Sequence, residues 1–359
     1  MRKIVFLWLM VLFFVSSCML LQNNYQKEPS NVLSSRFFHP RGDQDLQSTV
    51  EAIKKLNPKR IDWTYCDDVE ILKIYKKYNL PYSLAINPQY PDSLGYTTKK
   101  SRILDYNGNL YVAPWMKSWK INNPYWGCVN NPIFNGVFLK QGLKLASLGA
   151  YAIFVDDAVF NYRLVMDNKM GCFCNYCLDK FENKKKELNR KQNLKSTLIS
   201  SVTQQSNKGK EVNKLVKEYE DFQKKSVINF LENWKFEIRK IYHEMVFLTN
   251  NYNGNWNEIY QVFDGGIAEL KQQYINSNDL DSLYGLADKL GKTQLFTIAI
   301  EDKDIHYRLL KYNIKNKKES IYPWDVFISG KSQRYYMNID TIAFKEKEYT
   351  KALKKNNKK

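Results

Sequence analysis

Three cysteines lie within six residues in the middle of the chain, and residues of this type at this spacing can bind a metal ion. Cys172, Cys174 and Cys177 form a C-x-C-x-x-C pattern. Thiolates so arranged converge on one tetrahedral ion, which needs a fourth ligand from elsewhere in the chain. Disulfides are one alternative in an exported protein, although cysteines this close along the chain pair awkwardly with one another, and free thiols are the other. The pattern therefore favours a structural zinc site.

Acidic residues follow several apolar runs that are typical of β-strands. They could supply the two carboxyl groups that glycoside hydrolysis requires. The chain has only three His and no evident Ser–His pairing, which argues against acyl transfer. At any one position the alternative is an Asp that caps a helix or forms a turn. The candidate catalytic residues are Asp156 and Asp157 after the fourth run, Asp264 after the sixth and Glu301 after the seventh.

Aromatic and amide side chains near the same strand ends could bind a sugar. Flat rings with a polar edge suit the C–H faces of sugars, although each aromatic taken singly could also be a core residue. The segment 111–126 holds three Trp and two Pro with little helical periodicity, which is unusual for a buried core segment. The candidate substrate-binding residues are Trp63, Tyr65, Asn87, Trp115, Trp119 and Asn250.

The elements that must position these residues are strands alternating with helices. Helical stripes lie at 46–56, 69–78, 134–148 and 215–242. Eight such strands over about 320 residues predict an α/β fold, a (β/α)8 TIM barrel, whose active site forms at the C-terminal ends of the strands. No glycine-rich phosphate loop follows a strand, so a dinucleotide-binding open sheet has no support. The strand-like runs are 36–38, 60–65, 82–86, 151–155, 245–249, 261–263, 294–300 and 324–328.

The predicted barrel spans residues 35–340 and is followed by a basic tail at 341–359. Residues 183–217 are rich in Lys, Asn and Gln and only weakly periodic. We expect them to form a helical insertion after strand 4 and not a second domain.

The first 17 residues have the features of a signal peptide. Arg2 and Lys3 precede an apolar run at 4–15, which is shorter than the roughly 20 residues of a transmembrane helix. The residues before Cys18 resemble a bacterial lipobox, in which Cys18 receives a lipid; a plain secretory signal is the alternative. Residues 18–34 would be a tether. We therefore expect an exported lipoprotein of the bacterial cell envelope, anchored to a membrane through its lipid and without a nucleic-acid partner.

The charge of the chain is strongly basic. Lys and Arg number 55 against 37 Asp and Glu, for a formal net charge of +18. Such an excess often indicates a polyanionic partner, but the lysines are scattered and accompanied by much Asn, Ile and Tyr, as in a genome-wide compositional bias. The 44% hydrophobic content is globular, and sparse Gly and Pro exclude collagen-like and Pro-rich architectures. Charge alone therefore identifies no partner.

The cysteines and their neighbours resemble the β-galactosidases of glycoside hydrolase family 42. Cys128 is followed by Val-Asn-Asn-Pro, and the C-x-C-x-x-C cluster by Leu-Asp-Lys-Phe. In that family an upstream cysteine and such a cluster bind a structural zinc on the loops of the barrel. The resemblance, which covers roughly residues 59–328, implies Cys128, Cys172, Cys174 and Cys177 as the zinc ligands. We expect no organic cofactor.

The same resemblance implies catalytic positions. Family 42 enzymes are retaining, with an acid/base Glu after strand 4 and a nucleophilic Glu after strand 7. The strand that ends at Glu301 resembles the nucleophile strand. Strand 4 departs from the family, because Asp156, Asp157 and Ala158 stand where Asp-Asn-Glu is expected. Ala158 occupies the acid/base position, and Asp157 is the nearest substitute.

We predict a glycosidase with a two-carboxylate mechanism acting on an oligo- or polysaccharide. Glu301 would be the nucleophile and Asp157 or Asp156 the proton donor. In a second assignment an Asp after strand 4 is the nucleophile and Asp264 or Glu269 the acid, with Asp264 better placed because Glu269 is expected in a helix. The alternatives are a catalytically degenerate glycan-binding lipoprotein, favoured by the missing acid/base Glu, and a surface protein that binds acidic polysaccharide through its charge. The sequence does not set the oligomeric state.

Overall fold

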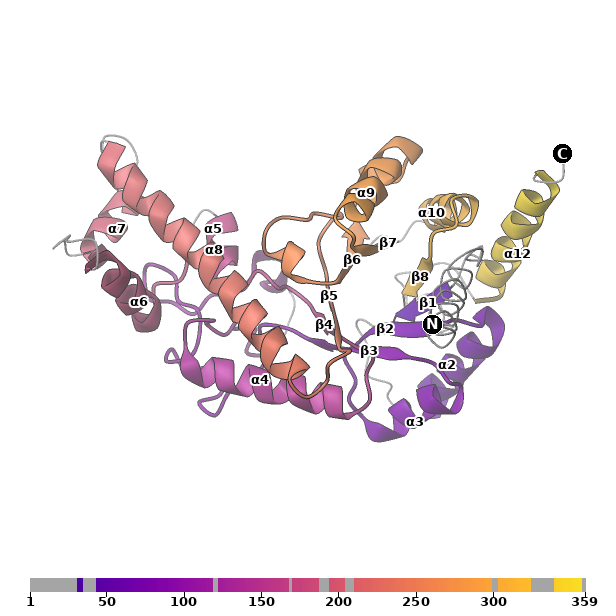
Figure 1. The fold of residues 1–359 in the computed structure, drawn as a ribbon, viewed down its shortest axis with the longest axis horizontal. Helices are drawn as coiled ribbons and strands as arrows, with labels where there is room; N and C mark the ends of the chain where they lie inside the picture. Colours follow the sequence, from indigo (N-terminus) through magenta and orange to yellow (C-terminus); the bar gives the residue numbers. More distant parts are fainter. Residues whose placement is uncertain are drawn as a thin grey trace, which may run out of the picture.

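The protein is an eight-stranded parallel barrel surrounded by helices. The computed structural model describes residues 31–34, 43–118, 122–167, 170–186, 194–203, 210–298, 303–323 and 339–356. The strands pair in the order β7-β6-β5-β4-β3-β2-β1-β8, and β7 also contacts β8, so that the sheet is nearly closed (Figure 1). The predicted (β/α)8 barrel is confirmed. The strands are β1 (Asn31–Ser34), β2 (Arg60–Thr64), β3 (Tyr82–Ile86), β4 (Ala152–Val155), β5 (Val246–Thr249), β6 (Gly265–Leu270), β7 (Thr293–Ile298) and β8 (Ser320–Pro323).

Helices lie between the strands, and those after β4 extend beyond the barrel. There α8 packs against α7 and α4, so the helical insertion after strand 4 is confirmed (Figure 1). Polar side chains cap the N-termini of several helices. At the start of α4, for example, the Asn131 side chain accepts hydrogen bonds from two backbone N–H groups. The helices are α2 (Asp43–Leu56), α3 (Val69–Lys77), α4 (Pro132–Ser147), α5 (Tyr162–Met166), α6 (Asn175–Lys186), α7 (Leu194–Thr203), α8 (Lys210–Arg239), α9 (Ser277–Lys289), α10 (Lys303–Lys315) and α12 (Ile339–Asn356), with 3-10 turns η1 (Pro114–Met116), η2 (Tyr260–Val262) and η3 (Gln272–Tyr274).

Three strands lie away from the predicted runs. β1 begins at residue 31, within the segment expected to be a tether, and β8 ends at residue 323; the predicted runs 36–38 and 324–328 are outside the described residues. The prediction of a strand at 261–263 is wrong, because η2 occupies that segment and β6 follows it. The strand β6 was not predicted because it begins with two glycines, a residue type that is uncommon in strands. A Cβ at Gly265 would lie 2.9 Å from Leu248, and one at Gly266 would lie 2.4 Å from Asn251.

The interior of the barrel is packed with side chains. Trp63 and Phe154 stack with ring centroids 4.4 Å apart, and both are almost fully buried. Parallel barrels are filled in this way by alternate strand residues, so the interior is a core and not a channel. The other buried members of this layer are Val32, Ala85, Ala152, Leu248, Ile267, Leu295 and Ile321.

A charged network lies at the N-terminal ends of the strands. Arg60 Nε is 2.8 Å from Asp62 Oδ2, and Arg60 Nη2 is 2.6 Å from Glu319 Oε2. The Tyr151 hydroxyl donates to the other oxygen of Asp62 at 2.7 Å. This end of the barrel is therefore held by paired groups and leaves the opposite end for chemistry.

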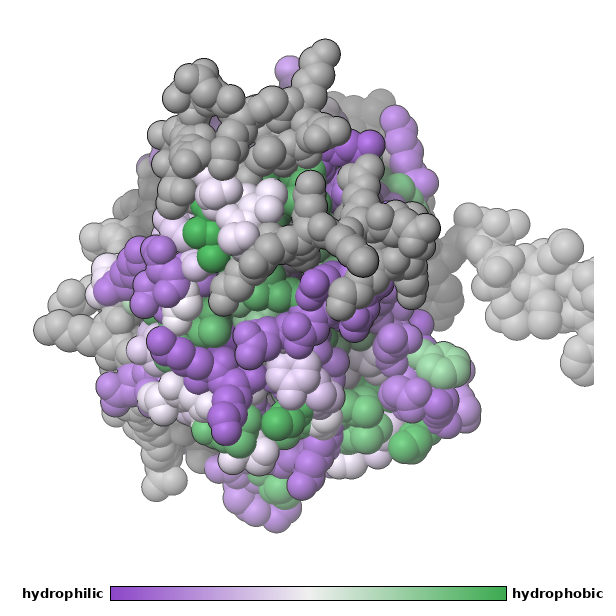
Figure 2. All heavy atoms as spheres, turned by 90° about the vertical axis from the view of Figure 1, so that its left-hand side faces the viewer, coloured by the Kyte–Doolittle hydropathy of each residue, from purple (hydrophilic) through white to green (hydrophobic). Residues whose placement is uncertain are grey.

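The C-terminal tail is helical, and much of it belongs to the barrel. Helix α12 contacts α2 and α10, so most of the expected tail packs against helices of the barrel (Figure 1). Figure 2 shows the described part of the face on the side of α6 and α7, where hydrophilic residues lie among the hydrophobic ones. Among the helices of the described residues, none is long and apolar enough to cross a membrane. The predicted signal peptide and Cys18 lie outside the described residues.

Candidate active site

The C-terminal ends of β2 to β6 bring together three carboxyl groups and several tyrosine and amide side chains. Asp156 and Asp157 directly follow β4, and Glu269 lies near the end of β6. Tyr65 follows β2, and Asn250 follows β5. Because all strands are parallel, these positions share one end of the barrel, which is where active sites of this fold form.

Asp156 is oriented by three hydrogen-bond donors. The Tyr65 hydroxyl donates to its Oδ2 at 2.7 Å, while Asn250 Nδ2 and the Asp157 backbone N–H donate to its Oδ1 at 3.2 and 3.0 Å. Burial raises the pKa of Asp156 to about 6, and the charge of Glu269 adds to the rise, while the hydrogen bonds oppose it. This carboxyl group is therefore fixed in place and keeps its proton to a higher pH than an ordinary aspartate does.

Asp157 carries a proton more readily than an ordinary aspartate. Burial raises its pKa well above the usual value, and the charges of Asp156 and Glu269 raise it further. The Tyr252 hydroxyl donates to Asp157 Oδ1, and the positive charge of Arg163 also lowers the pKa. The backbone of Asp157 has a φ of 52°, in the left-handed region that is rare for aspartate. Such a residue, held near other carboxylates, can donate a proton.

Glu269 lies in a strand, so the prediction that it belongs to a helix is wrong. It lies two residues after the barrel-facing Ile267 on β6 and therefore shares its face, which directs Glu269 to the inside of the barrel mouth. Its charge contributes to the raised pKa of both Asp156 and Asp157. These three residues form the acidic cluster of the site.

Asp264 lies at the opposite end of the barrel, so its predicted place after a strand is wrong. It precedes β6, because that strand begins at residue 265. Its carboxylate accepts hydrogen bonds from Arg239 Nη2 and the Phe247 backbone N–H, each at 2.7 Å, and lies 3.5 Å from Lys235 Nζ. Asp264 therefore joins α8 to the start of β5 and lies away from the acidic cluster.

The aromatic residues predicted to bind sugar differ in where they lie in the structure. Trp63 is 1% exposed and belongs to the barrel core, because an irregularity in β2 turns it inward, where its backbone N–H donates to Ser83 Oγ at 2.9 Å. This prediction is wrong. Trp115 is partly exposed, and Arg163 stacks over its ring at 4.4 Å from the centroid. Trp119 and Glu301 lie outside the described residues.

A cavity of about 490 Å³ opens beside the acidic cluster, at the ends of β2 and β3. Tyr65 lines it and also binds Asp156, so that one residue belongs to both the cavity and the cluster. Asn87, which follows β3, lines it as well. Its walls are mainly hydroxyl, amide and aromatic groups, and they include Gln89, Tyr90, Tyr96, Asn122, Asn123 and Gln141.

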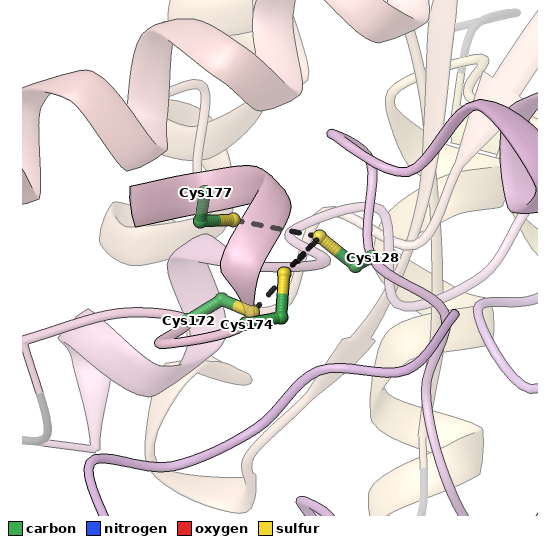
Figure 3. Close-up of side chains that lie close together, drawn as sticks. All are labelled: Cys128, Cys172, Cys174 and Cys177. Atoms are coloured by element: carbon green, nitrogen blue, oxygen red, sulfur yellow. Dashed lines mark hydrogen bonds between the residues drawn. The ribbon is translucent and has the colours of Figure 1, made fainter. Parts of the chain in front are cut away.

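The four cysteines predicted to bind zinc lie together and are buried. Their sulfur atoms all lie within 4.8 Å of one another (Figure 3). Cys128 Sγ is 3.5 Å from both Cys174 Sγ and Cys177 Sγ, and 3.9 Å from Cys172 Sγ. A tetrahedral ion with Zn–S bonds of ~2.3 Å places sulfurs about 3.8 Å apart. The cluster can therefore hold a metal ion of this kind, and none of its members forms a disulfide.

Amide groups surround the cysteine cluster and donate to its sulfurs. Asn161 Nδ2 lies 3.3 Å from both Cys128 Sγ and Cys177 Sγ, and Asn130 Nδ2 lies 3.2 Å from Cys177 Sγ. Burial raises the pKa of Cys128, but hydrogen bonds from the other three thiols and from Asn161 outweigh it and lower that pKa well below the ordinary value. Burial and the hydrogen bond with Cys128 raise the pKa of Cys172 and Cys177 well above the ordinary value, so the donors favour thiolate most clearly at Cys128. Thiolate is the form that binds metal.

Two residues of the candidate site, Tyr252 and Arg163, were not predicted from the sequence. Tyr252 lies two residues after the predicted Asn250, so its position in the loop after β5 could have identified it as a candidate. Arg163 lies in a short helix with no motif to mark it. Ala158, at the expected acid/base position, is fully buried in the core, so that position supplies no proton donor.

No family model and no curated protein matches the chain. Its fold is similar to solved glycoside hydrolases. The glycoside hydrolase domain of Pseudomonas aeruginosa PelA is 10% identical, with 82% of this chain and 94% of that one covered and a TM-score of 0.43, and Aspergillus fumigatus Ega3 in complex with galactosamine is 9% identical, with 84% and 93% covered and a TM-score of 0.42. A Flavobacterium johnsoniae family 31 dextranase complexed with isomaltotriose is 12% identical, with 90% of this chain and 38% of that one covered and a TM-score of 0.48. This likeness concerns the fold alone, and membership of family 42 stays a prediction.

Proposed function

We propose that the protein is a glycoside hydrolase whose proton donor is Asp157. The observation that carries the proposal is the coupled acidic cluster at the active-site end of the barrel. Burial and mutual repulsion raise the pKa of Asp156 and Asp157, so the two hold a proton at a pH where isolated aspartates hold none. Glycoside hydrolysis needs one protonated and one ionised carboxyl group beside the scissile bond.

In this mechanism Asp157 protonates the glycosidic oxygen as the sugar leaves. The Tyr252 hydroxyl and the charge of Arg163 then stabilise the aspartate that remains. Asp156 stays oriented by Tyr65 and Asn250, and its negative charge helps to keep the proton on Asp157 until the glycosidic oxygen accepts it. The chemistry that each group performs thus follows from what it contacts.

We assign the second carboxylate to Glu269. Its charge acts on both aspartates, and it comes from β6, two strands away from β4 in the sheet. Glu301, the nucleophile implied by the resemblance to family 42, is the alternative. A retaining mechanism needs carboxyl groups ~5–5.5 Å apart, and an inverting mechanism needs ~6.5–9.5 Å.

The substrate would be an oligo- or polysaccharide. The cavity of about 490 Å³ has the volume of a small-ligand site, and its hydroxyl, amide and aromatic walls suit sugar hydroxyls and ring faces. The similar solved structures in complex with galactosamine and isomaltotriose agree with this class. Export and anchoring through a lipid on Cys18 are part of the proposal and rest on the N-terminal sequence alone.

We further propose that the cysteine cluster holds structural zinc. Four thiolates would fill the coordination sphere and leave no open position for a substrate or water. The residues Cys128, Cys172, Cys174 and Cys177 fit this ion in donor type, spacing and burial. The metal would order the loops after β3 and β4 and take no part in bond cleavage.

The test is sugar release from a broad panel of oligosaccharides and envelope glycans by the mature chain. We expect Asp157→Asn and Glu269→Gln each to lower kcat about 10²- to 10⁴-fold, with Glu301→Gln as the competing variant. Asp264→Asn is the matched control at the other end of the barrel and should keep kcat. Full activity in Asp157→Asn would overturn the assignment of the donor. Glycan binding without hydrolysis across the panel would overturn the enzymatic proposal and support a binding protein.

A further inference from the structure

The turn that carries Asp157 is attached to the cysteine cluster through one buried side chain. Asn161 lies four residues after Asp157 and is fully buried. Its Nδ2 lies 3.3 Å from Cys128 Sγ, from Cys177 Sγ and from Gln223 Oε1, and its Oδ1 accepts the Val129 backbone N–H at 3.1 Å. This amide therefore joins the loop after β4 to the cluster and to α8.

The turn between Asp157 and Asn161 has an unfavourable backbone. Asp157 and Phe160 have φ values of 52° and 38°, although neither is glycine. Residues in the left-handed region cost of order 1–3 kcal/mol each and persist where the surroundings hold them. The segment between them is fully buried, and Asn161 is its last anchor before α5. Without that anchor the backbone that aims Asp157 would lose a restraint.

Arg163 extends the same connection to the acidic cluster. It lies two residues after Asn161, and its charge lowers the pKa of Asp157. Its guanidinium lies 2.9 Å from Asp167 and stacks on Trp115. A displacement of the turn would therefore move both the carboxyl group and the cation beside it.

We propose that Asn161 is a positioning residue that makes the geometry of Asp157 depend on the state of the cysteine cluster. N–H groups bond more strongly to metal-bound thiolates than to neutral thiols or disulfides. Metal loss or thiol oxidation therefore weakens the hold of Asn161 and loosens the turn from Asp157 to Arg163. That this coupling affects catalysis rests on the proposed function, but the coupling between the cysteine cluster and the turn at 157–163 does not depend on it.

The test compares two amides that both donate to the cluster. Asn161→Ala removes the contact to Cys128 and Cys177 on the catalytic turn, while the control Asn130→Ala removes the contact to Cys177 from a loop before α4. Hydrogen exchange at residues 156–163 is measured by mass spectrometry, with β3 as an internal reference. The zinc-loaded wild type, the chelator-treated wild type and both zinc-loaded variants are compared. The chelator-treated wild type, which carries no substitution, keeps the test decisive if the alanine variant does not fold.

We expect chelation and Asn161→Ala each to speed exchange at 156–163 roughly tenfold while β3 is unchanged, and Asn130→Ala to leave the turn protected. Unchanged exchange after chelation, or an equal effect of Asn130→Ala, would overturn the coupling. None of these readouts uses enzymatic activity. A chain that shows the coupling but hydrolyses no glycan would therefore refute the proposed function and leave this inference standing.

Discussion

Replacing Asp156 by Asn should stabilise the protein at neutral and alkaline pH. Burial holds the pKa of Asp156 at about 6, against an ordinary value of 3.8. The folded state thus binds this proton more tightly than the unfolded state. The stability it contributes is fully present below pH 3.8 and is lost as the pH rises through 6. By linkage the loss reaches about 3 kcal/mol.

The asparagine is neutral at every pH and avoids this loss. Its carbonyl oxygen can keep the two N–H donors, Asn250 and the Asp157 backbone, and its NH2 group then faces the Tyr65 hydroxyl, which loses its acceptor; this offsets about 1 kcal/mol. The expected net gain in the free energy of unfolding is therefore about 2 kcal/mol at pH 8, and roughly half of the pH-dependent part should be present at pH 5. The assay is urea unfolding of the zinc-loaded protein at both pH values, followed by tryptophan fluorescence.

Asp288→Asn is the matched control, because Asp288 is exposed and pairs only at the surface with Lys318. Its effect should stay within about 0.5 kcal/mol at both pH values. If Asp156→Asn is less stable than the wild type at pH 8, or if its advantage does not grow from pH 5 to pH 8, the reasoning about burial of this carboxyl group is refuted.

Three further predictions concern glycine, Asp264 and the metal. Gly171→Ala should destabilise the fold by about 2–4 kcal/mol in thermal unfolding, because the φ of Gly171 is 122° and the new Cβ would lie 2.4 Å from Gln223. The control is Gly136→Ala in α4, whose new Cβ meets nothing within 4 Å; it should be neutral or stabilise the fold by up to ~1 kcal/mol. Equal effects of the two would contradict this account. Asp264→Asn should lower stability by up to about 1 kcal/mol, because Arg239 and Lys235 lose a partly exposed carboxylate partner, while kcat stays within twofold in the sugar-release assay. Chelation at pH 7 should lower Tm by at least about 5 °C, measured by calorimetry, and re-addition of Zn²⁺ should restore it; an unchanged Tm would argue against a structural metal.

The sequence revealed the barrel because its strands are apolar and regularly spaced. β3 has the bounds predicted for it, and β2, β4, β5 and β7 overlap the predicted runs closely. The cysteine ligand set followed from a resemblance, and the structure brings all four sulfurs together. Asp156 and Asp157 were found because they directly follow a strand that reads clearly. Patterns of this kind are local, so one sequence is enough to show them.

The misses come from packing between distant segments. β6 opens with two glycines that have no β propensity but permit close contact with β5 and Asn251. Because the strand was predicted too early, Asp264 was expected at the C-terminal end of the barrel instead of the N-terminal end, and Glu269 was expected in the following helix. Trp63 looked like a sugar-binding residue because nothing in the sequence shows the irregularity that turns it onto Phe154.

The cysteine cluster also bears on the order in which the barrel assembles. Cys128 is separated from Cys174 by 46 residues, and the intervening chain contains α4 and β4. Closing a loop of this length costs an unfolded chain on the order of 3 kcal/mol of entropy. A metal ion captured early supplies that closure before any distant strands have met. The middle of the barrel would then form first and serve as the template on which the strands on either side add, so folding rates should rise with metal concentration.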